Sequence, residues 1–162
     1  MATGSSASGV DAVASYLDEQ GVRYDVVEHR TTYTANAEAR AAGVPPEDVA
    51  KTVLLREGDG YRLAVIAASD RLDVDKARGL FGGSKSLRLA TEDEMRADFP
   101  DFEVGALPPL GPLFPAPEVL DRKLLEHDRI LFTGGDHRHG VLIDPNDLVQ
   151  LTQAKVADVR AD

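Results

Sequence analysis

Two short stretches of the sequence carry the residue types best suited to chemistry. Lys51 stands near the start of an apolar run, residues 49–55, whose β-branched and aliphatic side chains predict a buried strand. Residues 104–112 combine glycine with closely spaced prolines, which excludes a helix or a regular strand and predicts a stiff loop. Fixed backbone N–H groups opposite a lysine would suit a carbonyl oxygen or an oxyanion.

Lys51 has two interpretations on spacing alone. Its ammonium group either extends from the strand end into solvent, or lies in a pocket where it holds an anion or a carbonyl oxygen of a substrate. Placing an ammonium beside an apolar strand costs free energy unless a partner compensates for the lost water. The residues around it must decide between these two roles.

Composition restricts the class of protein. The chain has 162 residues, 43% apolar and 28% charged, which is typical of one soluble domain. It has no cysteine, and no apolar run approaches the roughly 20 residues that span a bilayer, so we expect a cytoplasmic protein without membrane contact. The net charge of -10 argues against non-specific coating of nucleic acid.

Other constellations of reactive residues are weak. His137 and His139 flank Arg138, whose charge opposes a metal cation, so a polar hairpin turn is the better interpretation. The acidic residues 70, 73 and 75 lack the glycine and the terminal glutamate of a calcium loop and are better helix caps. The sequence has no phosphate-binding glycine loop and no Gly-x-Ser-x-Gly motif.

Local patterns predict the elements that position these residues. A helix at 10–20 precedes a strand at 22–28, and Thr34 caps an alanine-rich helix that ends at Gly43. The clearest hairpin joins 51–56 to 61–68 through a turn of glycine and acidic residues. On the first strand, we expect one face to carry Val22, Tyr24 and Val26.

The second half of the chain gives a similar mixture. Thr91 and Glu94 form a capping box, and Asp144 caps a last helix. The other expected elements are a helix at 72–81 and strands at 87–90, 130–133 and 141–143. Together they predict a single mixed α/β (α+β) domain at 10–152 with a mixed or antiparallel sheet, between a flexible tail at 1–9 and a loosely held tail at 153–162.

The order of these features resembles the YbaK/ProX family. The features are His29, Thr34 with its alanine-rich helix, Ala50-Lys51-Thr52-Val53, a hairpin, and Gly105-x-x-x-Pro109-Leu110-Gly111. Members of this family are free-standing relatives of the editing domain inserted in bacterial prolyl-tRNA synthetases. The resemblance runs from about residue 10 to residue 152, which is nearly the whole chain.

The resemblance implies a fold with a curved, barrel-like sheet and an activity. The activity would be trans-editing, the hydrolysis of the ester of a mischarged aminoacyl-tRNA, without a metal or another cofactor. Lys51, Gly105 and Pro109 match the family's functional lysine and glycine-x-x-x-proline loop, and a hydroxyl of the terminal adenosine would help to position or activate water. The expected substrate-binding residues are His29, Tyr33, Thr34, Ala106, Leu107 and Pro108.

Substrate and partners are less defined by the sequence. Pro108 before Pro109 is a pattern of subgroups that edit alanine, serine or threonine rather than cysteine. The acidic charge suits tRNA only if basic residues gather at the pocket rim, or if a synthetase or an elongation factor supplies the affinity. The alternatives are a non-catalytic module that binds an aminoacyl-adenosine or a protein partner, and a hydrolase of another small ester. The basic residues considered for the rim are Arg30, Arg56, Arg71, Lys85 and Arg88.

Overall fold

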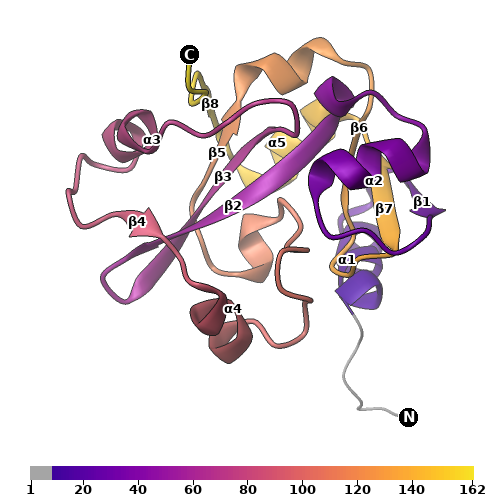
Figure 1. Ribbon diagram of the computed structural model, residues 1–162, viewed down its shortest axis with the longest axis horizontal. Helices are drawn as coiled ribbons and strands as arrows, with labels where there is room; N and C mark the ends of the chain where they lie inside the picture. Colours follow the sequence, from indigo (N-terminus) through magenta and orange to yellow (C-terminus); the bar gives the residue numbers. More distant parts are fainter. Residues whose placement is uncertain (1–8) are drawn as a thin grey trace.

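The computed structural model describes residues 9–162, which form one mixed α/β domain (Figure 1). Among these residues, no helix reaches the length and apolar character that a membrane span requires. The helices are α1 Gly9–Gln20, α2 Ala35–Ala42, α3 Val74–Leu80, α4 Glu92–Asp98 and α5 Pro145–Thr152. The strands are β1 Tyr24–Glu28, β2 Val49–Glu57, β3 Gly60–Ala67, β4 Arg88–Leu89, β5 Glu118–Asp121, β6 Ile130–Thr133, β7 His139–Ile143 and β8 Lys155–Ala157.

The strands form one mixed sheet, as the sequence predicts. Their order is β1-β7-β6-β2-β3-β5-β8, and β4 pairs with the far end of β2. The pairs β2–β6, β3–β5 and β5–β8 are parallel, while the other pairs are antiparallel. In the described chain β1 and β8 stay at opposite edges, so the sheet is open and the expected barrel-like form does not close.

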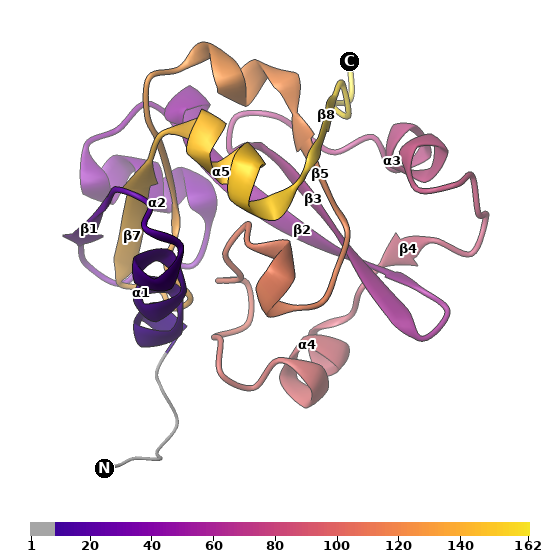
Figure 2. The ribbon, with the colours of Figure 1, turned by 180° about the vertical axis from the view of Figure 1, so that it is seen from behind.

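Helices cover both faces of the sheet. Helix α2 lies in front of the sheet in Figure 1, whereas α1 and α5 lie in front of it in the opposite view of Figure 2. The alternation along β2 explains this arrangement. Val49 packs with Ala39 of α2, and the next residue, Ala50, joins the large cluster that holds Leu17 of α1 and Leu148 of α5.

Local capping chemistry holds α2 where the sequence places it. The hydroxyl of Thr34 accepts a hydrogen bond from the Ala37 amide at 3.1 Å. Gly43 ends the helix with a φ of 72°, which favours glycine. The capping box of Thr91 and Glu94 at α4 is confirmed in the same way. The predicted hairpin is also confirmed, and it runs diagonally across the molecule with α2 near one end (Figure 1).

The predicted pattern of the first strand was partly wrong. Strand β1 begins at Tyr24 rather than Val22; within it Tyr24 and Val26 share a face by alternation, as expected, but Val26 is 45% exposed. The reason is the position of β1, which is an edge strand that pairs only with β7 within the described chain. An edge strand contributes little to the core, so its alternation does not report burial faithfully.

The expectation of a loosely held segment after Gln153 was also wrong. This segment forms β8, which pairs with β5, and Val159 is fully buried. The buried carboxylate of Asp121 holds it, because its Oδ1 accepts from the Val159 amide at 3.1 Å and its Oδ2 lies 2.9 Å from Nε of Arg160. At the other end, the tail predicted at 1–9 lies outside the described residues except for Gly9, which begins α1.

Candidate functional site

The edge of β2 that faces away from β3 is only partly covered. Strand β6 pairs with Val49 and Ala50, and β4 pairs with Leu55 and Arg56, so no strand of the described chain covers residues 51–54 on this edge. A cavity of about 170 Å³ opens at this break. It is lined by Thr32, Tyr33, Thr34, Ala35, Glu38, Ala50, Lys51, Thr52, Gly105, Leu107, Thr133 and His137.

Lys51 lines this cavity and is half-buried. Within residues 9–162 its ammonium group has no hydrogen bond and no ion pair. Burial lowers the pKa of Lys51, while the charge of Asp70 raises it and that of Arg71 lowers it further. A cation that the fold leaves without a partner can contact a ligand in the cavity at little cost.

Thr52 presents its backbone to the same break in the sheet. The carbonyl oxygen of Leu54 accepts from the Ala90 amide on this side of β2, so by alternation the N–H of Thr52 points to this side as well. The pairing with β6 ends at Ala50. It would have to continue by one more residue for a carbonyl oxygen of β6 to accept a hydrogen bond from the Thr52 amide. The Thr52 hydroxyl is also buried without a hydrogen-bond partner among the described residues. Both groups are therefore available to a ligand.

The glycine-proline loop reaches the cavity through Gly105 and Leu107 only. Gly105 adopts a φ of 83°, a conformation that favours glycine. The amide of Ala106 donates to the carbonyl of Glu103 at 2.9 Å, and Ala106 does not line the cavity. Pro108 and Pro109 belong to this loop but are buried and do not line the cavity. Their contribution is to the stiffness of the loop rather than to a contact with a ligand.

His137 is a cavity residue that the sequence did not identify. Its Nε2 lies 2.9 Å from the carbonyl oxygen of Val104, which can only accept, so Nε2 carries the proton and Nδ1 of the neutral ring is free to accept. The ring contacts Tyr33, with 4.9 Å between the ring centroids, and Tyr33 is 73% exposed at the mouth of the cavity. His139 points elsewhere and contacts Asp136 and Glu28.

His29 lies behind the cavity rather than in it. The ring is buried, and its Nε2 is 2.9 Å from Oε2 of Glu38, which does line the cavity. Burial raises the pKa of Glu38, and the contact with His29 opposes that shift. Thr34 lines the cavity as expected, although its hydroxyl caps α2. The sequence did not predict Glu38, because nothing in the alanine-rich pattern shows which helix residue faces the sheet break.

The basic residues considered for the rim do not gather there as a set. Arg56 and Arg88 both form ion pairs with Glu94 of α4, near the far end of the hairpin. Arg71 is close enough to Lys51 to affect its pKa, and Arg30 is exposed directly after His29. The rim therefore offers scattered positive charge rather than a continuous patch for phosphates.

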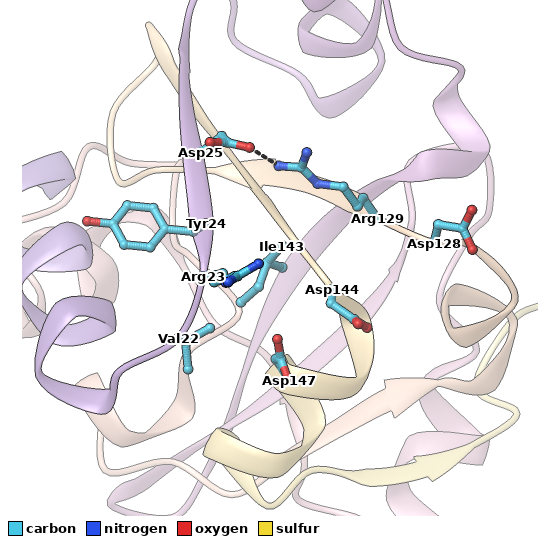
Figure 3. A pocket seen from close by; sticks show the side chains of 9 residues that line it. All are labelled: Val22, Arg23, Tyr24, Asp25, Asp128, Arg129, Ile143, Asp144 and Asp147. Atoms are coloured by element: carbon cyan, nitrogen blue, oxygen red, sulfur yellow. Dashed lines mark hydrogen bonds and ion pairs between the residues drawn. The ribbon is translucent and has the colours of Figure 1, made fainter.

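A larger hollow of about 630 Å³ lies beside β1 and the start of α5 (Figure 3). It is less suited to an aminoacyl ester, because no lysine lines it and its two arginines face four aspartates. Arg129 is already paired with Asp25, as Figure 3 shows, and Asp144 caps α5. The aspartates that line it are Asp25, Asp128, Asp144 and Asp147.

Comparisons with known proteins agree with this fold. The model of the aminoacyl-tRNA editing domain matches residues 29–151. The prolyl-tRNA editing protein ProX of Acetoanaerobium sticklandii is 24% identical over 149 residues, which cover 88% of this chain and 90% of that protein. A structure described as a candidate trans-editing enzyme for prolyl-tRNA synthetase is 32% identical with a TM-score of 0.85, covering 98% of this chain and 100% of that one.

A third match is the structure of the hypothetical protein APE2540, which is 28% identical with a TM-score of 0.82 and covers 92% of this chain and 99% of that one. The family match, residues 29–151, includes every residue that lines the cavity, from Thr32 to His137. This agrees with the resemblance carried by Lys51 and the Gly105 loop. The chain therefore belongs to the family of aminoacyl-tRNA editing domains, the YbaK/ProX hydrolases that deacylate aminoacyl-tRNA.

Proposed function

We propose that the cavity at the break in the sheet binds the aminoacyl group of a mischarged tRNA and hydrolyses its ester in trans. The preferred residue would be small, such as alanine, serine, threonine or cysteine, and the protein would act in the cytoplasm. The size of the cavity supports this, because about 170 Å³ is below the roughly 300–1,000 Å³ of typical sites for drug-sized ligands. The aminoacyl group would enter, while the terminal adenosine of the tRNA remains at the mouth near Tyr33.

The unpartnered ammonium of Lys51 beside the unpaired amide of Thr52 is the observation that carries this proposal. In the reaction, water attacks the carbonyl carbon of the ester, and negative charge develops on the carbonyl oxygen. Lys51 and the Thr52 N–H would stabilise that oxygen, as donors held in place by a strand. His137 Nδ1 and a hydroxyl of the terminal ribose would orient the water.

Collapse of the tetrahedral intermediate completes the reaction. The bond between the carbonyl carbon and the ribose oxygen breaks, and the proton released by the attacking water passes to that oxygen. The products are the free amino acid and the uncharged tRNA with its terminal hydroxyl restored. No group of the protein is consumed, so Lys51 serves as a fixed cation throughout.

The tRNA body requires a separate source of affinity. The net charge of -10 and the scattered rim cations support a contribution from a synthetase or an elongation factor. The relative named as a prolyl-tRNA editing protein suggests tRNA for proline as the carrier. Weak salt dependence of binding to the isolated tRNA would agree with few phosphate contacts.

A panel of mischarged tRNAs tests the proposal. We expect the protein to release alanine, serine, threonine or cysteine from at least one tRNA faster than the spontaneous rate, and to leave esters of bulky residues intact because they exceed the cavity. The measurement is the loss of radiolabelled aminoacyl-tRNA with time. Binding of the panel without hydrolysis of any member would instead support the non-catalytic binding module.

A further inference from the structure

We propose that Glu38 recognises the α-amino group of the aminoacyl ester. The site would then accept aminoacyl-tRNA and reject aminoacyl-tRNA in which the α-amino group of the amino acid is blocked. This inference rests on the proposed function, because it assigns a second contact within the same cavity. It depends on the proton that His29 and Glu38 share, on the oxygen of Glu38 that has no partner, and on the size of the cavity.

The two ring nitrogens of His29 both face acceptor atoms. Nδ1 lies 2.7 Å from the carbonyl oxygen of Arg30, which cannot donate, so Nδ1 carries a proton. Nε2 lies 2.9 Å from Oε2 of Glu38, and this contact also needs a proton. That proton resides either on the ring, which gives an imidazolium and a carboxylate, or on Glu38 Oε2, which gives a neutral pair.

The other oxygen of Glu38 is an acceptor in both states. Oε1 has no hydrogen-bond partner within the described chain, although the side chain is only 5% exposed and lines the cavity. Because Oε1 is not enclosed by the protein, it is open to the cavity and can accept a hydrogen bond there. A donor on a ligand in the cavity would satisfy this oxygen; burial raises the pKa of Glu38, and the contact with His29 opposes that shift and so favours the carboxylate.

The backbone nearby fits the carboxyl group closely. Gly140 of β7 faces Glu38, and a Cβ at that position would lie 3.2 Å from Oε2 and 2.7 Å from Cδ1 of Leu131. The absence of a side chain at Gly140 therefore leaves the space in which Oε2 meets His29. With Oε2 held in this way, Oε1 has a defined position on the cavity wall.

The chemistry of the substrate fits this placement. In an aminoacyl ester a single carbon separates the α-amino nitrogen from the ester carbonyl, so the groups that recognise them must line one small cavity. Lys51 and Glu38 both line the cavity of about 170 Å³. The α-amino group is a hydrogen-bond donor whether it is protonated or neutral, and the imino group of proline keeps this ability. In an N-acylated residue, the acyl group adds bulk at the position where the amino group would donate a hydrogen bond to Glu38.

The test compares alanyl-tRNA with N-acetyl-alanyl-tRNA as substrates. We expect the wild-type protein to hydrolyse alanyl-tRNA with a kcat/KM about tenfold or more above that for the acetylated form. Glu38→Met keeps the length of the side chain but removes both oxygens, so it should lower kcat/KM for alanyl-tRNA about tenfold and abolish the preference. Glu38→Gln keeps an acceptor and should be intermediate, while Glu47→Gln at an exposed site should match the wild type.

The wild-type comparison does not depend on the folding of any variant. Equal hydrolysis of the two substrates by the wild type would overturn the role of Glu38 and leave the proposed deacylation standing. Retention of the full preference in a folded Glu38→Met variant would overturn it as well. Hydrolysis of neither substrate, nor of any other aminoacyl-tRNA, would overturn the proposed function and this inference together.

Discussion

Replacing Lys51 by methionine is expected to lower kcat for deacylation about 10²–10³-fold, the usual cost of removing one donor to an oxyanion. The ammonium is half-buried and unpartnered in the described chain, and burial lowers its pKa. The fold therefore gains nothing from this charge. Methionine keeps the apolar stem of the side chain, so the melting temperature should stay the same or rise. Activity and stability would then change in different directions.

The measurement is single-turnover hydrolysis of a mischarged tRNA, combined with thermal unfolding followed by circular dichroism. Lys85→Met is a matched control, because Lys85 is exposed and does not line the cavity. It lies in the segment between α3 and β4, which Figure 1 shows. Its activity should equal that of the wild type. A folded Lys51→Met variant with full activity would remove Lys51 from the chemistry and leave it as a structural residue.

Replacing Glu118 by glutamine should remove most of the dependence of stability on pH between about 5 and 8. Glu118 is buried on β5, where its Oε1 accepts from the amide of Gly111 at 2.8 Å and its Oε2 has no partner among the described residues. Burial raises the pKa of Glu118 to about 8, and the hydrogen bond from Gly111 lowers it only in part. The folded protein therefore keeps this carboxyl group protonated at pH values where the unfolded chain ionises it.

The sign of the effect follows from proton binding. Between pH 4.5 and about 8 the folded state holds one proton more than the unfolded state at this group, so the free energy of unfolding falls as the pH rises. The stabilisation is complete below pH 4.5 and is lost as the pH rises through about 8, in total roughly 3–5 kcal/mol. Glutamine does not titrate, so the variant should lack this decline.

Urea unfolding at a series of pH values measures the difference. Glu19→Gln, at an exposed position of α1, should keep the wild-type pH profile. The Gly111 amide that bonds Glu118 belongs to the loop 104–112, which borders the cavity through Gly105 and Leu107. An identical decline of stability in the wild type and in Glu118→Gln would show that Glu118 is already ionised in the folded protein.

Much of the fold could be predicted because it rests on local chemistry. The cap at Thr34, the glycine at position 43 and the capping box at Thr91 depend on residues within one helical turn of each other. Strands β5 and β8 were harder to predict. Glu118–Asp121 has only four residues with acids at both ends. Strand β8 is held by its pairing with β5, and the buried carboxylate of Asp121 holds Val159 just after it, so an apolar pattern of its own is missing.

The residues of the site likewise fall into those that the sequence identifies and those that only the fold brings to the cavity. Lys51 and Gly105 could be identified from residue type, because a lysine in an apolar strand and a glycine in a rigid loop are visible in the sequence alone. Thr52 could not, because its free amide results from the end of the β2–β6 pairing. Glu38 and His137 could not either, because each meets the cavity through contacts between distant segments, with His29 and with Val104 respectively.

A crystal structure with a non-hydrolysable alanyl-adenosine analogue tests the position of the site most directly. We predict that the alanyl group occupies the cavity at the break in the sheet, with its carbonyl oxygen within about 3.2 Å of both the Thr52 amide nitrogen and Lys51 Nζ. We also predict that the amino nitrogen approaches Glu38 Oε1. An analogue bound in the larger hollow beside β1, or one whose carbonyl points away from Lys51, would contradict these predictions.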